Sequence, residues 1–265
     1  MTQTDKMLSR KEGKIGYLTF NNPERHNAVS LDMWEAAEGF LEDFKNDNNI
    51  RVVVVTGAGG KAFVSGADIS KFEKERSTQE GVDRYNAAVD RANNAFYTFP
   101  KPTIAMIRGY CIGGGFGLAL CCDMRICTEG SKFGVPAAKL GLGYRYDGLK
   151  KLVDLVGPSF AKEVFYTARQ FTAREAETMG FVNRVLPDAE GELEKYVKDY
   201  AETIAANAPI TVDSIKFIVG EAVKDPDQRD LKACEAWVTR AFQSSDYTEG
   251  RKAFMEKRKP NFTGS

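Results

Sequence analysis

Two glycine-rich segments of this 265-residue chain have the composition best suited to chemistry. One is TGAGGKAFVSGADISKF (56–72), and the other is GYCIGGGFGLALCCD (109–123), where three glycines open an apolar stretch. Glycine lets a backbone approach a ligand closely, and a helix start offers unpaired N–H groups at the positive end of its dipole. Such segments can hold anions or developing negative charge, although glycines also serve tight packing of a helix on a sheet.

Neither segment matches a nucleotide-phosphate motif. The pattern G-x-x-x-x-G-K-[ST] is absent, and residues 57–60 lack the G-x-G-x-x-G spacing of dinucleotide-binding turns. If these glycines are functional, they therefore indicate a backbone site for negative charge rather than a phosphate loop.

The histidine and cysteine content excludes two common enzyme classes. His26 is the only histidine and lies in the polar stretch NNPERHNAVS, where an exposed side chain is expected. A zinc hydrolase or a Ser-His-Asp hydrolase is therefore not expected, and neither is a metal site. The five cysteines form no C-x-x-C pair, and four lie in apolar surroundings typical of buried, reduced thiols. They are Cys111, Cys121, Cys122, Cys127 and Cys234.

The overall composition excludes several other classes. Hydrophobic residues make up 43% of the chain, enough for a folded core, and 37 basic residues balance 37 acidic ones. This balance argues against nucleic acid or an anionic membrane as the main partner. No apolar stretch approaches the ~20 residues of a membrane span, and the first residues lack the apolar core of a signal peptide. We expect a soluble, cytoplasmic protein.

Strands and helices alternate in the first half of the chain. Apolar alternation or β-branched runs predict strands at 14–20, 51–57, 102–109 and 123–129. Between them, Ser30 can cap a helix that runs to about residue 46, and residues 113–122 are typical of a buried helix. This order predicts βαβ crossovers and an α/β core.

The remainder of the chain is predicted to be mainly helical. Thr172 with Glu175, and Asp246 with Glu249, have the spacing of capping boxes at helix starts. We therefore expect a sheet-containing core at 1–190 and a helical C-terminal region at 191–265. The helical region either folds back on the core or docks on a neighbouring subunit.

Several motifs taken together resemble the crotonase (enoyl-CoA hydratase/isomerase) superfamily. In sequence order they are NNPERHNAVS, VVVVTGAGGKAFVSGADI, FPKPTIAMIRGYCIGGGFGLALCCD, FTAREAETMGFVNRV and AFMEKRKPNF. The resemblance spans nearly the whole chain. It implies an α/β fold with a ββα-spiral core and a helical C-terminal trimerisation region. It also implies assembly as a homotrimer or as a dimer of trimers.

The resemblance further implies an acyl-CoA thioester as substrate, so coenzyme A enters as part of the substrate and no separate cofactor is expected. By motif position, the backbone N–H groups of Ala67 and Gly114 would polarise the thioester carbonyl. Fixed amide donors in a dry pocket stabilise an enolate oxygen without reorganisation, which agrees with the glycine-rich segments.

The same resemblance implies contacts to the CoA portion of the substrate. The loop containing Ala67, Asp68 and Ile69 would meet the adenine end through its backbone. Arg25 and the C-terminal Lys257 would contact phosphates, although exposed basic residues often bind nothing specific.

The chain departs from the pattern of the family's hydratases, which use two glutamates to add water across a double bond. One glutamate position is Gly117 here, and the other is Ala137. Each positioned acid or base typically contributes about 10²–10⁴ in rate. Ordinary hydration by the usual route should therefore be severely impaired.

The segment KLGLGYRYDGLKKL (139–152) offers replacements. Its L-G-x-x-Y spacing is similar to that of the methylmalonyl-CoA decarboxylase branch, although that branch has a histidine at the position of Ala67 and a glutamate at that of Gly117. Tyr144 would donate a hydrogen bond to a substrate carboxylate, and Arg145 would grip the carboxylate bidentately. Decarboxylation needs no base, because the oxyanion hole takes up the enolate.

Three functions therefore stay open, and a lyase-type reaction such as decarboxylation is the preferred one. The second is a hydratase or isomerase that uses Asp147 or Tyr144 in place of the glutamates. The third is a non-catalytic CoA-ester-binding subunit. Tyr144 could also be a packing aromatic, and Arg145 and Asp147 could belong to a solvated turn. An RNA-binding role is disfavoured by the neutral charge.

Overall fold

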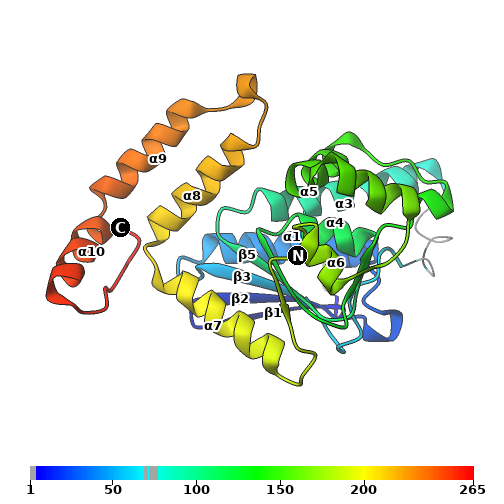
Figure 1. Cartoon of the computed structure of the whole chain (residues 1–265), viewed down its shortest axis with the longest axis horizontal. Helices are drawn as coiled ribbons and strands as arrows, with labels where there is room; N and C mark the ends of the chain where they lie inside the picture. Colours follow the sequence, from blue (N-terminus) through cyan, green and yellow to red (C-terminus); the bar gives the residue numbers. More distant parts are fainter. Residues whose placement is uncertain (1–3, 69–70, 72–76) are drawn as a thin grey trace.

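The computed structural model of the chain describes residues 4–68, 71 and 77–265. Within these residues the larger sheet has six strands in the order β1-β2-β3-β5-β7-β10 (Figure 1). Only β1 and β2 pair antiparallel, and the other neighbouring strands are parallel. The strands are β1 (Met7–Glu12), β2 (Ile15–Phe20), β3 (Val52–Gly57), β5 (Thr103–Ile107), β7 (Met124–Thr128) and β10 (Arg184–Leu186).

The valine run of β3 shows why this sheet is buried on both faces. Val53 and Val55 pack in the core that contains α1 (Leu31–Asn46), whereas Val52 and Val54 pack in a second core. The second core is covered by α7 (Glu192–Ala206). Side chains alternate across a strand, so a continuous β-branched run requires cover on both sides. The four strands predicted from the sequence, and the helix that follows Ser30, are confirmed.

A second, smaller sheet was not predicted from the sequence. In the described residues its strand order is β4-β6-β8-β9. Its strands are β4 (Ala62–Val64), β6 (Tyr110–Ile112), β8 (Lys132–Gly134) and β9 (Phe171–Thr172). Because β4 and β6 are parallel neighbours, the segments that follow them emerge at the same edge. Those segments are the two glycine-rich stretches.

Three helices lie together on one side of the molecule (Figure 1). They are α3 (Gln79–Tyr97), α4 (Gly114–Leu120) and α5 (Tyr146–Thr167). Helix α5 is interrupted at Gly157, which has a φ of 76° and precedes Pro158. Short 3₁₀ turns, η1 (Pro23–Arg25) and η3 (Ala137–Leu140), precede α1 and α5 respectively.

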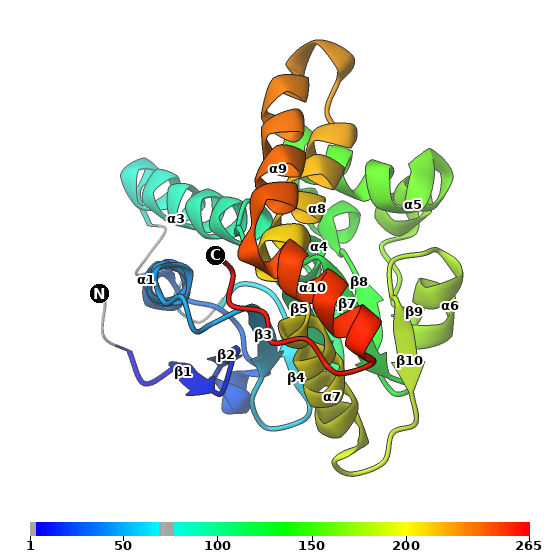
Figure 2. The same cartoon turned by 90° about the vertical axis from the view of Figure 1, so that its left-hand side faces the viewer.

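The helices after α7 extend away from the sheet (Figures 1 and 2). They are α8 (Pro209–Ala222), α9 (Leu231–Gln243) and α10 (Ser245–Glu256), with the turn η4 (Pro226–Gln228) between α8 and α9. The expected division at residue 190 precedes α7, whose apolar side packs on the sheet. The part that leaves the core therefore begins at Pro209.

Side chains of the core anchor this extension. Arg51 donates to the carbonyl oxygens of Ala205 and Phe262, at 3.0 and 2.7 Å. Lys216 of α8 donates to Asp123 at 2.7 Å. The extension nevertheless exposes large apolar side chains, among them Phe254, which is 82% exposed.

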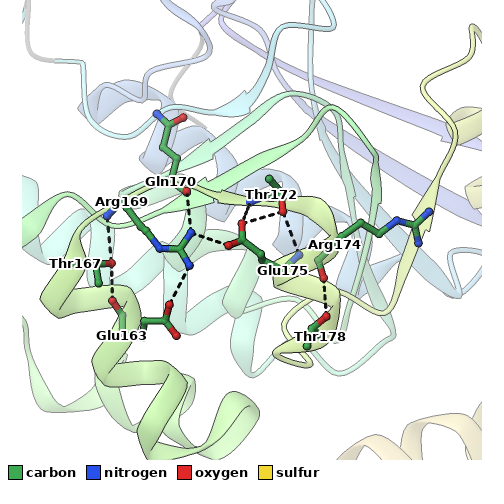
Figure 3. Close-up of polar contacts among 8 residues, drawn as sticks. All are labelled: Glu163, Thr167, Arg169, Gln170, Thr172, Arg174, Glu175 and Thr178. Atoms are coloured by element: carbon green, nitrogen blue, oxygen red, sulfur yellow. Dashed lines mark hydrogen bonds and ion pairs between the residues drawn. The ribbon is translucent and has the colours of Figure 1, made fainter.

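One predicted capping box is confirmed and one is wrong. Thr172 and Glu175 bond reciprocally at the start of α6 (Ala173–Thr178), as Figure 3 shows. Helix α10 instead takes Ser244 as its N-cap. Asp246, inside the first turn, accepts from the backbone N–H groups of residues 263 and 264, and Glu249 binds Arg258. Both carboxylates bind groups of the C-terminal tail, which folds over α10, so they do not cap the helix.

The described residues were also compared with the requirements of a membrane span and of a metal site. In these ranges no helix is long and apolar enough to cross a membrane. No group of three or more His, Cys, Asp or Glu side chains in the same ranges is arranged to hold a metal ion.

The Glu175 carboxylate predicts an acid-dependent stability. The Thr172 N–H and the Arg169 guanidinium, which also pairs with Glu163 of α5, lower the pKa of Glu175 to about 2 (Figure 3). Because its pKa is depressed on folding, its contribution is full above the unfolded value near 4.5 and is lost as the pH falls toward 2. We expect Glu175→Gln to lower the free energy of unfolding by about 0.5–1 kcal/mol at pH 7, and by progressively less between pH 4.5 and 2.

Urea unfolding at several pH values checks this expectation. Glu177→Gln is the matched control, because Glu177 belongs to the same helix and pairs with the exposed Arg174. A Glu175→Gln effect that does not change with pH would contradict the assignment.

Candidate active site

The two glycine-rich segments meet where they leave β4 and β6. Gly66 has a φ of 111° and Gly113 a φ of 57°, values that favour glycine. A Cβ atom built on Gly66 would lie 3.8 Å from the Gly114 nitrogen, and one on Gly114 would lie 3.6 Å from the Gly66 Cα. The two backbones are therefore in van der Waals reach of each other, and the positive φ angles of Gly66 and Gly113 shape the two turns.

The orientation of Ala67 follows from its bridge to Val29. Val29 N–H donates to the Gly66 carbonyl at 2.8 Å, and Asp68 N–H donates to the Val29 carbonyl at 3.0 Å. In this parallel bridge the flanking residues make both bonds, so the N–H of Ala67 points away from Val29. Within the described ranges, the N–H groups of Ala67 and Gly114 have no acceptor. They are two backbone donors on neighbouring segments, which suits a site for developing negative charge.

A buried asparagine pair fixes the position of Val29. Asn22 and Asn27 are both fully buried, and the Asn22 N–H donates to the Asn27 side chain at 2.9 Å. Asn27 Nδ2 donates to the Ala62 carbonyl of β4 at 2.7 Å, and Asn22 Nδ2 donates to the Ala28 carbonyl at 2.8 Å. Asn27 has a φ of 56°, a conformation that asparagine tolerates better than most residues. Neither asparagine was singled out from the sequence, where both merge into a polar loop.

A second chain of hydrogen bonds also ends at Val29, at its carbonyl oxygen. Trp34 Nε1 donates to the Tyr85 hydroxyl at 3.2 Å, and that hydroxyl donates to the Val29 carbonyl at 3.1 Å. The Trp34 ring also lies 4.0 Å from the Cβ position of Gly114. Helices α1, α3 and α4 are thus tied to the backbone that carries the two donors.

The three consecutive glycines have different roles. Gly113 precedes α4 with a positive φ, and Gly114 offers its N–H group. Gly115 packs on β4 so closely that a Cβ atom there would lie 2.0 Å from the Val64 carbonyl oxygen. The packing explanation of this cluster therefore holds for Gly115, and the functional explanation stays a prediction for Gly114.

The structure places Tyr144 beside Gly117, one of the two positions at which the resemblance led us to expect a glutamate to be lacking. A Cβ atom on Gly117 would lie 3.9 Å from the oxygen of the Tyr144 hydroxyl. The ring of Tyr144 packs edge-on against Phe165 with centroids 4.6 Å apart. Tyr144 as a whole is 41% exposed, but desolvation of its hydroxyl raises the pKa of that group, so it stays protonated at neutral pH and can donate a hydrogen bond. Ala137, at the second glutamate position, is buried and apolar.

The other candidates beside Tyr144 are placed differently. Arg145 pairs with Asp90 of α3, and its side chain is 68% exposed. Asp147 is exposed in the first turn of α5. The exposed segment around Arg145 agrees with a solvated turn, and its ion pair links that turn to Asp90 of α3.

The candidate CoA contacts lie in three places. Arg25 is exposed in η1, and its carbonyl and that of His26 accept from Ser65, next to the Ala67 loop. Asp68 is buried behind Ala67. Ile69 lies outside the described residues. Lys257 ends α10, at the opposite end of the molecule from α5 (Figure 1).

The cysteines near this region are protonated thiols. Cys111, Cys121, Cys122 and Cys127 are buried, as expected, and burial raises the pKa of Cys121 to about 11. Cys234 is half-buried. The four buried thiols have raised pKa values, the opposite of what a reactive nucleophile requires.

Comparison with known proteins agrees with this geometry. Residues 10–265 match the sequence model of enoyl-CoA hydratase/isomerase. The chain is 34% identical to a short-chain-enoyl-CoA hydratase of Clostridium acetobutylicum, over 97% of each protein. It is 33% identical to a crotonyl-CoA hydratase of Syntrophomonas wolfei, covering 97% of this chain and 98% of that protein. A crystal structure of an enoyl-CoA hydratase/carnithine racemase from Magnetospirillum magneticum superposes with a TM-score of 0.92 at 35% identity, covering 99% and 97% of the two chains.

The chain therefore belongs to the enoyl-CoA hydratase/isomerase family, within the crotonase superfamily. The resemblance and the α/β fold expected from the motifs are confirmed. The protein is an acyl-CoA enzyme of that superfamily.

Two neighbouring glycines of α4 give a matched prediction. Gly115→Ala places a Cβ atom 2.0 Å from the Val64 carbonyl, whereas Gly117→Ala meets nothing closer than the Tyr144 hydroxyl at 3.9 Å. We expect Gly115→Ala to lower the free energy of unfolding by about 1–3 kcal/mol, because β4 and α4 must separate. Gly117→Ala should raise it by up to about 1 kcal/mol through helix propensity. Chemical denaturation checks both, and equal effects would contradict the packing of α4 on β4.

Proposed function

We propose that this enzyme binds an acyl-CoA thioester and stabilises its enolate between the N–H groups of Ala67 and Gly114. The observation that carries the proposal is the contact between their two loops, with neither N–H paired in the described residues. Amide donors fixed in this way favour the enolate oxygen over the neutral carbonyl. Membership of the family supports the substrate class.

For the reaction we propose a lyase step, decarboxylation of an α-carboxylated acyl-CoA. The bond between Cα and the carboxylate carbon breaks, CO₂ leaves, and the electron pair forms the enolate. A proton from solvent then adds to Cα. The step requires no base on the protein, which suits a site with Gly117 and Ala137 at the glutamate positions. Tyr144 would orient the carboxylate as a neutral donor.

The proposed substrate contacts combine several parts of the fold. Arg25, Asp68 and Ile69 would hold the CoA portion beside the Ala67 loop. Lys257 follows α10, one of the helices that extend away from the sheet (Figure 1). It would therefore act on the site of a neighbouring copy, which suits the homotrimer, or dimer of trimers, that we propose. Arg145 would reach a substrate carboxylate only by leaving Asp90.

A hydratase or isomerase reaction is the second candidate. Two relatives are named as hydratases of short-chain-enoyl-CoA and crotonyl-CoA, which favours it. Here Tyr144 would be the proton-transfer group, because its hydroxyl lies beside Gly117, 3.9 Å from a Cβ atom built there.

Mass spectrometry distinguishes these reactions. The purified protein is incubated in D₂O with malonyl-, methylmalonyl-, saturated, 2-enoyl- and 3-enoyl-CoA. Our proposal predicts loss of CO₂ with gain of one deuterium from an α-carboxylated member. Hydration or bond migration would support the second candidate. Binding without any change of mass would identify a non-catalytic CoA-ester-binding subunit.

Substitutions at Tyr144 and Asp147 test the placement of the polar groups. We expect Tyr144→Phe to lower kcat/KM about 10²-fold or more, because the carboxylate loses its donor. Asp147→Asn, at the exposed start of α5, should retain activity within a factor of about three under the same reasoning. The reverse ranking would move the chemistry to Asp147.

A further inference from the structure

The backbone of Val29 binds both sides of Ala67. Its N–H donates to the Gly66 carbonyl at 2.8 Å, and its carbonyl accepts the Asp68 N–H at 3.0 Å. The peptide between Gly66 and Ala67 is planar and trans, so its carbonyl and its N–H point in opposite directions. The direction of the Ala67 N–H is therefore set by where Val29 holds the Gly66 carbonyl.

The Tyr85 hydroxyl is a second donor to the Val29 carbonyl, at 3.1 Å. It comes from the buried side of α3, where Tyr85 is only 4% exposed. Because the Val29 carbonyl already accepts the Asp68 N–H, it would keep a partner without this hydroxyl. A phenylalanine would fill the same space in the core. The hydroxyl therefore adds a constraint on the position of Val29 rather than the one hydrogen bond that a buried carbonyl needs.

Trp34 of α1 connects this hydroxyl with the second donor of the site. Its Nε1 donates to the Tyr85 hydroxyl at 3.2 Å, which leaves the hydroxyl proton for the Val29 carbonyl. The same indole ring is buried and lies 4.0 Å from the Cβ position of Gly114. The indole therefore lies beside one donor residue, and the phenol is bound to the residue that orients the other.

We propose that Tyr85 is a positioning residue of the active site: its hydroxyl, held by Trp34, fixes Val29 and so sets the direction of the Ala67 N–H. The inference rests on the proposed function, because it concerns the same pair of backbone donors, but not on the reaction that follows. Tyr85 acts through Val29 and touches no substrate atom. Hydrogen bonds weaken steeply away from their preferred geometry, so a small misplacement of the Ala67 N–H reduces the polarisation of the thioester carbonyl.

Infrared difference spectroscopy with butyryl-CoA, labelled with ¹³C at the thioester carbonyl, tests this role. The ester has no carboxylate to lose and no double bond to hydrate or move, so it stays intact during the measurement. In Tyr85→Phe we expect the fall in carbonyl frequency on binding to shrink by about half or more relative to the wild type. The dissociation constant should stay within about threefold, because oxyanion donors act mainly on the enolate.

Tyr17→Phe is the matched control. Tyr17 is also buried, but it packs in the core on the other face of the larger sheet, so this variant should keep the wild-type frequency. A second readout is turnover of whichever thioester the enzyme converts. There, kcat should fall about tenfold or more in Tyr85→Phe while KM changes little.

Each outcome bears on a distinct claim. A lower urea midpoint for Tyr85→Phe with an unchanged carbonyl frequency would make Tyr85 a packing residue and overturn the inference, while the proposed function stood. An equal loss of the frequency change in Tyr17→Phe would also overturn it, because the effect would then not depend on the bond to Val29. If the wild type showed no fall in frequency, or bound butyryl-CoA no better than free CoA, the proposed function would fail and this inference with it.

Discussion

The parallel pairing of β4 with β6 is the constraint on which the site depends. It delivers Gly66 and Gly114 to the same edge of the small sheet, close enough that a side chain on Gly66 would approach the second backbone. Gly115 then seats α4 on β4 with no room for a methyl group. Because both donors belong to the backbone, their direction is fixed by the fold itself, which is what stabilisation of a transient charge requires.

Hydrogen bonds from surrounding buried side chains hold this edge of the small sheet in place. Buried Asn22 and Asn27 hold the loop that carries Val29, and Trp34 reaches the same carbonyl through Tyr85. These buried polar groups satisfy one another's hydrogen bonds, and together they position the bridge between Val29 and Ala67. Some relatives are named as hydratases, whereas this chain has Gly117 and Ala137 at the two expected glutamate positions and a protonated Tyr144 beside Gly117. In the reaction that we propose, such a site would take up the charge released by bond cleavage.

Long, patterned elements could be predicted from the sequence, whereas short ones could not. The valine run of β3 and the glycine-opened α4 each contain a pattern that identifies them. Strands β4, β6 and β8 have three residues each, too few to show an alternation, and they exist through pairing with distant segments. The same limit applies to the site. Tyr144 was found by its motif, but the buried asparagines and the ion pair of Arg145 with Asp90 depend on tertiary contacts that no local pattern shows.

Infrared difference spectroscopy of a bound acyl-CoA labelled with ¹³C at the thioester carbonyl tests the central claim most directly. Two fixed N–H donors would polarise the carbonyl bond and weaken it. The account therefore predicts that the stretching frequency of the labelled carbonyl falls on binding, relative to the same ester in water. A frequency in the complex that equals or exceeds the value in water would contradict an oxyanion site between Ala67 and Gly114.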